Sequence, residues 1–180
     1  MPKVAEIKEE IEIPDGVELS IEEKAVHVKG EKGSLSKVLT YPKIDLKLKD
    51  NIVEISCSDS PHRKEKALIG TFKAHIKNMI KGVTEGFEYK MKTVYSHFPI
   101  KTSVEGTEFV IQNFLGERSS RKAKILENVN VEVKGDDVTV SGIDKEKVGQ
   151  TAANIERATK VKHRDIRVFQ DGVYIISKRG

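Results

Sequence analysis

Residues 117–124 bring together the types of side chain that bind phosphate groups. The segment consists of Glu117, Arg118, Ser119, Ser120, Arg121, Lys122, Ala123 and Lys124. The guanidinium of arginine offers a fork of donors that fits phosphate oxygens, the lysine ammonium adds a mobile charge, and serine hydroxyls can add neutral hydrogen bonds. This composition predicts a contact with a nucleic-acid backbone. A solvated surface loop is the alternative that composition leaves open.

A second basic segment lies near the end of the chain. Its candidate binding residues are Arg157, Lys160, Lys162, His163, Arg164, Arg167, Phe169 and Gln170. Arg157 and Lys160 also have a structural explanation, because cations at the C-terminal end of a helix interact favourably with its dipole. The dipole does not account for the cations from Lys162 to Arg167. We therefore predict that both basic segments contact a polyanionic partner such as a nucleic acid.

Charge is distributed unevenly along the chain. The 180 residues carry 32 Lys and Arg and 28 Asp and Glu, for a formal net charge of +4. Residues 1–23 contain two Lys and eight acids, whereas residues 157–180 contain seven Lys or Arg and two acids. A basic end indicates a polyanionic partner, either a nucleic acid or an acidic membrane surface, unless it is only solvated. No basic amphipathic helix or apolar run of about 18 residues supports a membrane, so none is expected as a partner.

The residue types that carry catalysis are scattered. The candidates are His27, His62, His75, His97, His163 and Cys57. They form no zinc spacing and no activated thiolate pattern, and the chain has no Walker loop and no Gly-x-Gly-x-x-Gly. We expect no enzyme activity, no metal and no cofactor in a soluble intracellular protein. A small enzyme with a pocket between two repeats is one rival hypothesis.

The tetrapeptide Gly30–Gly33 is comparable with the Gly-x-x-Gly loop with which KH domains clamp a nucleic-acid backbone. In KH domains this loop joins two helices, but here it follows a strand pattern directly. A tight turn is therefore the preferred interpretation. A free, KH-like regulatory RNA-binding module is the second rival hypothesis.

An internal repeat predicts the fold. Apolar residues alternate in Val17–Gly30 and again in Val129–Gly142, 112 positions later, which is typical of two half-buried strands joined as a hairpin. Apolar residues at helical spacing predict helices over residues 62–81 and 144–160, and these two segments match at an offset of 79 positions. A glycine inside each helix suggests that each helix lies close to a sheet.

The remaining strands complete two similar domains. Strands are expected over residues 43–49, 51–56, 87–95, 101–104 and 108–114. The sequence thus predicts an α+β fold of two tandem duplicated domains, each an antiparallel or mixed sheet packed on one helix. We place the first domain at residues 1–81, the second at 82–172 and a basic C-terminal tail at 173–180. The last dozen residues are expected to be mobile without a partner.

Several long segments resemble one family. EIEIPDGVELS, VKGEKG, TFKAHIKNMIKGVTEGFEYKM, VYSHFPI, QNFLGERSSRKAKI, GQTAANIERAT and DIRVFQDGVYI are similar to the ribosomal protein L6 family of the large subunit. The resemblance covers nearly the whole chain and lies in the archaeal and eukaryotic branch, closer to the archaeal form. Arg118, Ser119 and Ser120 lie in a stretch that varies in the family, and Glu31 stands where the family often has proline.

The resemblance implies a structural role in translation. It implies two similar domains, of which the second carries most of the contact with large-subunit ribosomal RNA, near the stalk base and the sarcin–ricin loop. Neighbouring large-subunit ribosomal proteins and translational GTPases would lie nearby, and the protein would be cytoplasmic, in the ribosome. On physical grounds, we expect the protein to bind RNA by neutralising phosphates and by recognising the shape of the folded RNA. The major groove of A-form RNA is too deep and narrow for side chains to read the bases.

Overall fold

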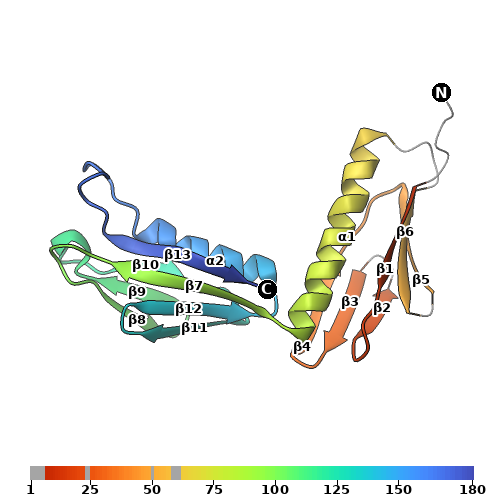
Figure 1. Ribbon diagram of the computed structural model, residues 1–180, viewed down its shortest axis with the longest axis horizontal. Coiled ribbons are helices and arrows are strands. Elements are labelled where there is room, and N and C mark those ends of the chain that lie inside the picture. Colours follow the sequence, from red (N-terminus) through yellow and green to blue (C-terminus); the bar gives the residue numbers. More distant parts are fainter. Residues whose placement is uncertain (1–6, 23–24, 50, 58–61) are drawn as a thin grey trace. The chain divides into compact units, whose positions relative to one another are not determined.

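The computed structural model describes residues 7–22, 25–49, 51–57 and 62–180. The chain divides into two compact units, Met1–Glu85 and Gly86–Gly180 (Figure 1). Over these described ranges, each unit combines antiparallel sheets with one α-helix. The predicted α+β fold and the predicted duplication are therefore confirmed.

Unit 1 contains two three-stranded sheets and the helix α1. Its elements are β1 (Ile7–Glu12), β2 (Glu18–Glu22), β3 (Ala25–Gly30), β4 (Gly33–Val38), β5 (Ile44–Lys49), β6 (Ile52–Cys57) and α1 (Arg63–Thr84). The strand orders are β1-β6-β5 and β2-β3-β4, and all pairs are antiparallel. The helix contacts strands of both sheets, because its apolar residues recur every three or four positions and form one buried face.

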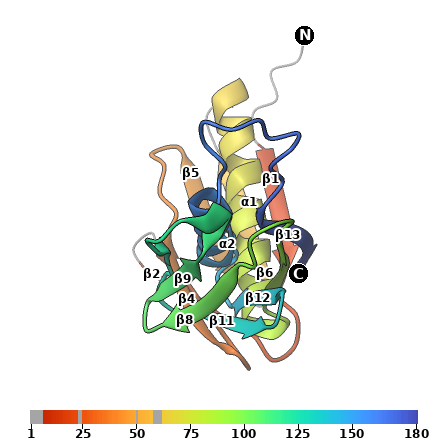
Figure 2. The same ribbon diagram turned by 90° about the vertical axis from the view of Figure 1, so that its left-hand side faces the viewer.

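Unit 2 contains a four-stranded sheet, a three-stranded sheet and the helix α2. Its elements are β7 (Phe87–Val94), β8 (Lys101–Glu105), β9 (Glu108–Gln112), the short 3-10 helix η1 (Phe114–Gly116), β10 (Arg121–Lys124), β11 (Val129–Lys134), β12 (Asp137–Gly142), α2 (Lys145–Ala158) and β13 (Gly172–Arg179). The strand orders are β11-β12-β7-β13 and β10-β9-β8. The paired strands β8 and β9 lie side by side in both ribbon views (Figure 1, Figure 2).

The two units repeat one topology in the same order along the chain. In each unit the sixth strand lies between the first and the fifth, the third lies between the second and the fourth, and the helix follows the sixth. The register also repeats: Leu46 pairs with Ile55 between β5 and β6, and Val131 pairs with Val140 between β11 and β12, 85 positions later. Strands β1 to β6 and α1 thus correspond to β7 to β12 and α2.

The predicted correspondence between hairpins is wrong, although both hairpins form. The 112-residue spacing matched Val17–Gly30 with Val129–Gly142. In the structure, β2 and β3 correspond to β8 and β9, whereas β11 and β12 correspond to β5 and β6. Every half-buried strand alternates with a period of two, so alternation alone cannot tell one hairpin from another.

The predicted match between the helices is confirmed. Ile69 and Ile76 in α1 correspond to Val148 and Ile155 in α2, and all four side chains are buried in the cores of their units. The helices extend over Arg63–Thr84 and Lys145–Ala158, close to the predicted ranges. The topology supports the same match, because α1 follows β6 and α2 follows the corresponding strand β12.

The role expected for the helix glycines is wrong. A β-carbon on Gly70 would meet no atom within 4 Å, and one on Gly149 would meet only the Tyr89 ring and its hydroxyl, at an ordinary 3.6 Å. The close approaches occur at strand glycines instead. A β-carbon on Gly30 or Gly142 would lie 2.8 or 2.9 Å from a valine side chain of the neighbouring helix. Helix and sheet therefore approach most closely where the strand has no side chain.

The C-terminal segment is a strand and not a tail. β13 pairs antiparallel with β7, with Val173 opposite Thr93 and Ile175 opposite Met91. Val173 is fully buried and the segment pairs with β7, so the expected basic tail at residues 173–180 is wrong. The mobility expected of the last dozen residues stays a prediction. Strand pairing and burial of the apolar residues at the start of β13 stabilise this segment. This stabilisation is larger than the repulsion between the cations Lys178 and Arg179 at its end.

Candidate nucleic-acid interface

The structure brings the two predicted basic segments together at one end of unit 2. Residues 117–124 run from η1 into β10, and residues 157–170 form the last turn of α2 and the loop before β13. Arg121 joins them, because its Nη1 donates to the carbonyl oxygens of Ala158 and Lys160 at 2.9 and 3.2 Å. Further along, the Asn154 amide of α2 donates to the Lys124 carbonyl of β10 at 3.1 Å. Segments separated by more than 30 residues thus form one surface.

Arg121 is engaged within the protein. Its Nε and Nη2 donate to the two carboxylate oxygens of Glu117 at 2.8 and 2.6 Å, and its guanidinium lies 4.2 Å above the centre of the Phe114 ring. With two further bonds to carbonyls, four of its five N–H groups have partners. This geometry makes Arg121 a brace between β10, η1 and the end of α2, and leaves little of it for a phosphate.

The brace also fixes the charge of Glu117. The hydrogen bonds from Arg121 hold the pKa of the Glu117 carboxyl below its usual value of 4.5, and the charges of Arg121 and Arg164 lower it further. Burial acts in the opposite direction and raises this pKa. The carboxylate therefore stays ionised at neutral pH. Arg121 and Glu117 consequently contribute almost no net charge to the surface.

Lys122 is partly neutralised as well. Its ammonium donates to the Glu108 carboxylate across β9 and β10 at 2.7 Å. This bond and the charge of Glu108 raise the pKa of the Lys122 ammonium. Both groups are about half exposed, so water screens the pair and its contribution to stability is small.

Other predicted residues keep their side chains available. Within the described chain, the following side chains are exposed and make no hydrogen bond or ion pair: Arg118, Ser119, Ser120, Lys124, Arg157, Lys160, Lys162 and His163. Five of these residues are Lys or Arg and can face an anion without first breaking an internal bond. They form the group that we call the open cations: Arg118, Lys124, Arg157, Lys160 and Lys162.

The loop between α2 and β13 has internal order. The Asp165 carboxylate accepts from the backbone N–H and the Nε of Arg167 at 2.9 and 3.3 Å, and the Asp165 carbonyl accepts from the N–H of Phe169 at 2.9 Å. Arg164 stacks over the Phe169 ring at 4.8 Å, and the Gln170 amide donates to the Arg167 carbonyl at 3.4 Å. Arg164 and Phe169 can therefore act together as a flat, charged platform.

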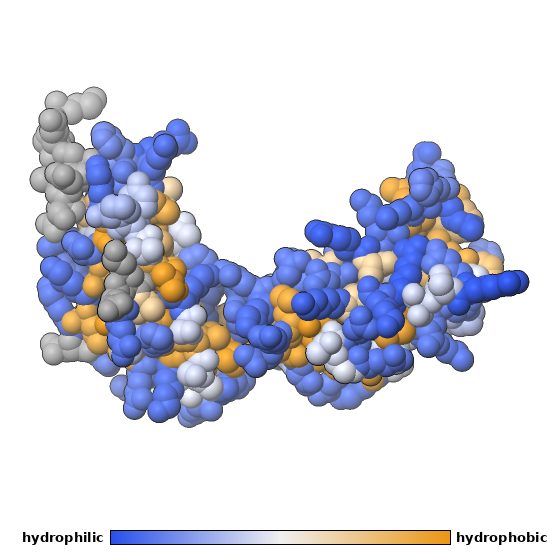
Figure 3. Space-filling model, turned by 180° about the vertical axis from the view of Figure 1, so that it is seen from behind, coloured by the Kyte–Doolittle hydropathy of each residue, from blue (hydrophilic) through white to orange (hydrophobic). Residues whose placement is uncertain are grey.

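Apolar side chains stand among the cations of this loop. Ile166 and Val168 are 68% and 66% exposed, although both are large aliphatic residues. Figure 3 shows hydrophobic atoms among hydrophilic ones at this end of unit 2. A partner that covers this loop would remove their surface from water, which adds an apolar contribution to the electrostatic one.

Sequence reasoning missed one segment of this surface. The loop between β7 and β8 carries Tyr95 and Phe98, which are 40% and 42% exposed. It lies against η1, because the Asn113 amide donates to the Pro99 carbonyl at 3.1 Å and a β-carbon on Gly116 would lie 3.2 Å from the Phe98 ring. Two aromatic residues and a histidine within five residues were the available signal. Exposed rings of this kind can stack on unpaired bases.

The rival sites have little structural support. Gly30 pairs with Gly33 where β3 turns into β4, so the interpretation of Gly30–Gly33 as a tight turn is confirmed. The Lys32 amine at this turn donates to the Glu85 carbonyl. The residues that the structure describes contain no cluster of three His, Cys, Asp or Glu suited to a metal ion. They also contain no helix with the length and apolarity needed to cross a bilayer.

Comparison with known proteins decides the family. The sequence model described as "Ribosomal protein L6" matches residues 13–86 and 98–172, one match in each unit. The chain belongs to the ribosomal protein L6 family. It is 56% identical to the "Large ribosomal subunit protein uL6" of Methanobrevibacter smithii over 178 residues, which cover 99% of each chain.

A second archaeal relative agrees. The protein of the same description from Methanothrix thermoacetophila is 51% identical over 176 residues, covering 98% of this chain and 99% of the relative. The resemblance to the L6 family is therefore confirmed. The family consists of ribosomal proteins and not of enzymes, which agrees with the expectation that the chain is not an enzyme.

Proposed function

We propose that this L6 family member is a structural protein of the large ribosomal subunit that binds large-subunit ribosomal RNA through one end of unit 2. The observation that carries the proposal is the convergence of two distant basic segments into a surface whose open cations have no internal partner within the described chain. Unit 2 has 17 Lys and Arg against 13 Asp and Glu, whereas unit 1 has 15 of each, so the whole net charge belongs to unit 2.

The proposed mechanism is phosphate neutralisation on a rigid frame. Arg118 lies between η1 and β10, Lys124 lies in β10, and Lys160 and Lys162 lie in the loop that follows α2. Arg121 holds this loop against β10 through its bonds to the carbonyls of Ala158 and Lys160. Cations on an ordered backbone bind phosphates with less loss of backbone entropy than cations on a mobile tail. Such a surface recognises the shape of folded RNA, and the rings of the β7–β8 loop can stack on unpaired bases.

The position within the subunit is a further part of the proposal. Resemblance to the family supports a site near the stalk base and the sarcin–ricin loop, with other large-subunit proteins and translational GTPases as neighbours. The relatives' description as large ribosomal subunit proteins supports the subunit assignment. A ribosomal protein works in the cytoplasm, as part of the ribosome. A role for Ser119, Ser120, His163, Arg164, Arg167, Phe169 and Gln170 in the RNA contact stays a prediction.

The test compares matched pairs of lysines. The site variant is Lys124→Ala with Lys162→Ala, and the control variant is Lys47→Ala with Lys64→Ala, two exposed lysines of unit 1 that make no ion pair within the described chain. Binding to a large-subunit RNA fragment is measured against salt concentration for both. Removing one cation that neutralises a phosphate lowers the slope of log K against log salt by about 0.7–0.9, so the slope of the site variant should fall by about 1.5.

The control variant should keep the slope of the wild type. Equal losses in the two variants would mean that general charge drives binding and no defined surface exists. A larger loss in the unit 1 variant would contradict the proposal and move the site to unit 1. Circular dichroism of both variants shows whether folding is intact.

A further inference from the structure

Among the described residues, no strand pairs with the outer edge of β1, although the corresponding edge in unit 2 is covered. In unit 2, β13 pairs with the side of β7 that faces away from β12. In unit 1, β1 ends the order β1-β6-β5, and no described strand pairs with its other side. An edge strand with unpaired N–H and C=O groups is a template for a further strand. The position beside β1 in unit 1 thus corresponds to the position that β13 occupies beside β7 in unit 2.

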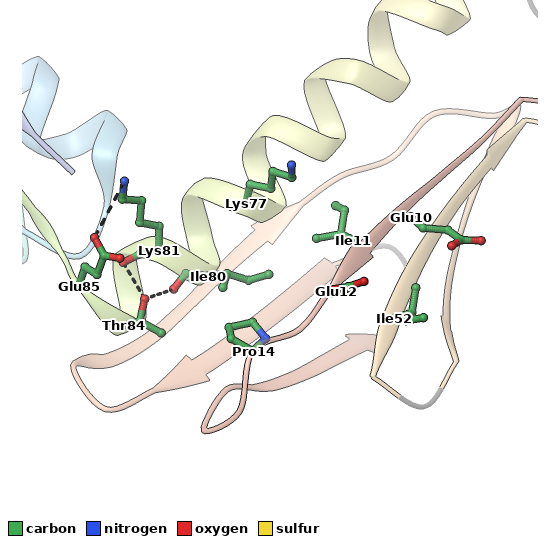
Figure 4. Close-up of a pocket in the computed structure, with 10 residues that line it drawn as sticks. All are labelled: Glu10, Ile11, Glu12, Pro14, Ile52, Lys77, Ile80, Lys81, Thr84 and Glu85. Atoms are coloured by element: carbon green, nitrogen blue, oxygen red, sulfur yellow. Dashed lines mark hydrogen bonds and ion pairs between the residues drawn. The ribbon is translucent and has the colours of Figure 1, made fainter.

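A groove runs along this outer edge. It has a volume of about 780 Å³ and lies between β1 and the second half of α1. Its lining includes Glu10, Ile11 and Glu12 of β1 and Lys77 and Ile80 of α1. Figure 4 shows Ile11 and Ile80 in the space between strand and helix. The groove therefore has two largely buried isoleucines at its base and charged side chains around them, beside the outer edge of β1.

One residue that lines the groove has a counterpart that contacts β13 in the other unit. At the helix offset of 79 positions, Ile80 corresponds to Thr159. The Thr159 hydroxyl accepts a hydrogen bond from the backbone N–H of Val173 in β13 at 3.0 Å. The groove in unit 1 is thus the counterpart of the space that β13 occupies in unit 2.

We infer that the groove along β1 accepts an extended segment of another protein, which adds to the sheet as an antiparallel strand. The segment alternates apolar residues with lysine or arginine. Its backbone pairs with β1 as that of β13 pairs with β7, a mode of recognition in which main-chain bonds supply affinity and side chains supply specificity. This interaction goes beyond the proposed RNA contact and uses the other unit.

The pairing of β7 with β13 in unit 2 indicates which residues of the incoming segment are apolar. Met91 of β7 pairs with Val138, and Ile11 of β1 pairs with the corresponding Val53, so Ile11 is the counterpart of Met91. Met91 lies opposite Ile175 of β13. The incoming segment therefore has an apolar residue opposite Ile11, on the side that faces α1.

The charges of β1 give the basic positions. The counterparts of Glu10 and Glu12 are Lys90 and Lys92, which lie opposite the neutral Ser177 and Tyr174 of β13. Both glutamates are exposed and have no ion pair within the described chain. Cations opposite them would form favourable cross-strand pairs. A second copy of β1 fits poorly, because it would bring further glutamates against this edge.

The test uses two synthetic peptides that differ only in charge. The first copies residues 172–179 with Tyr174→Lys and Ser177→Lys, and the second has Glu at the same two positions. Each is titrated to millimolar concentration into the full chain, and amide NMR shifts are followed. The lysine peptide should perturb residues 8–12 and bind about tenfold more tightly than the glutamate peptide, because two cross-strand pairs change sign.

Charge reversal in the protein provides the decisive control. In the variant Glu10→Lys with Glu12→Lys, the preference should invert in favour of the glutamate peptide. The variant Asp45→Lys changes the other edge strand of the same sheet, β5. Its counterpart in unit 2, β11, pairs with no added strand among the described residues, so we expect no peptide at β5 and an unchanged preference in this variant. Circular dichroism checks that each variant is folded.

Three outcomes overturn the inference: no shift at residues 8–12 with either peptide, shifts centred on residues 44–49, or a preference that ignores charge reversal at Glu10 and Glu12. The RNA titration proposed above uses lysines outside the groove and can succeed or fail independently. Loss of peptide binding with intact RNA binding would therefore reject only the strand-addition site.

Discussion

Replacing Arg121 with alanine should destabilise unit 2 rather than simply weaken RNA binding. The side chain is only 24% exposed and makes two bonds to the Glu117 carboxylate, two to carbonyl oxygens at the end of α2, and a stacking contact with Phe114. A partly exposed charged hydrogen bond contributes about 1 kcal/mol and a cation–π contact about 0.5–1 kcal/mol. The contributions are not additive, so we expect a loss of about 3 kcal/mol.

Calorimetry of the full chain measures this effect. For a domain of the size of unit 2, 1 kcal/mol corresponds to a change in Tm of about 4–8 °C, so the transition of unit 2 should fall by roughly 12–24 °C. Arg121→Lys should recover less than half of the loss, because an ammonium cannot reach the carboxylate and both carbonyls in a fork. Amide exchange in residues 113–124 should accelerate in both variants.

Arg118→Ala is the matched control, since Arg118 lies three residues away, is exposed and makes no ion pair within the described part of the chain. It should change stability by less than about 0.5 kcal/mol but weaken RNA binding. The reasoning is refuted if Arg121→Ala unfolds like the wild type and loses more RNA affinity than Arg118→Ala. Arg121 would then be a phosphate contact and not a brace.

Two other predictions concern Glu117 and the glycines. Because the folded pKa of Glu117 is lowered, its stabilisation is complete above about pH 5 and is lost as the pH falls through that lowered pKa, below 4.5. The gap in urea unfolding between the wild type and Glu117→Gln should close on acidification, and a gap independent of pH contradicts this. Gly30→Ala should cost about 1–3 kcal/mol, because the new carbon would lie 2.8 Å from the Val83 side chain and 3.0 Å from its carbonyl oxygen. Gly70→Ala, with open space around it, should stabilise by about 0.5–1 kcal/mol, and thermal unfolding with the same sign for both glycines would contradict the packing argument.

The sequence alone was sufficient for features that depend on local periodicity and on charge. Helical spacing of residues such as Ile69 and Ile76 determines which face of α1 is buried, and period-two alternation determines that residues 129–142 form a hairpin. The concentration of Lys and Arg near residues 117–124 and 157–167 is likewise a property of the chain. These signals are local, so they can be recognised without knowing which residues are in contact in the folded protein.

Strands that need a neighbour to become stable were not visible in the sequence. β1 is mostly polar, with the sequence IKEEIE, and forms because β6 supplies the pairing partner. β13 looked like a basic tail because its cations are local, whereas the edge of β7 and the core that bury Val173 come from distant residues. The same limit explains the wrong match between hairpins, since alternation is shared by many strands and strand order is not.

Tertiary structure also decided which cations are available. Arg118 and Arg121 are three residues apart in one basic segment, and no sequence pattern separates them. Folding places the carbonyls of Ala158 and Lys160 beside Arg121 and leaves Arg118 in solvent. The chain therefore determines by itself that unit 2 is basic, but only the fold determines which charges are consumed in holding it together and which remain for a partner. The physical reason is that pairing depends on distances between residues far apart in the sequence, which composition does not contain.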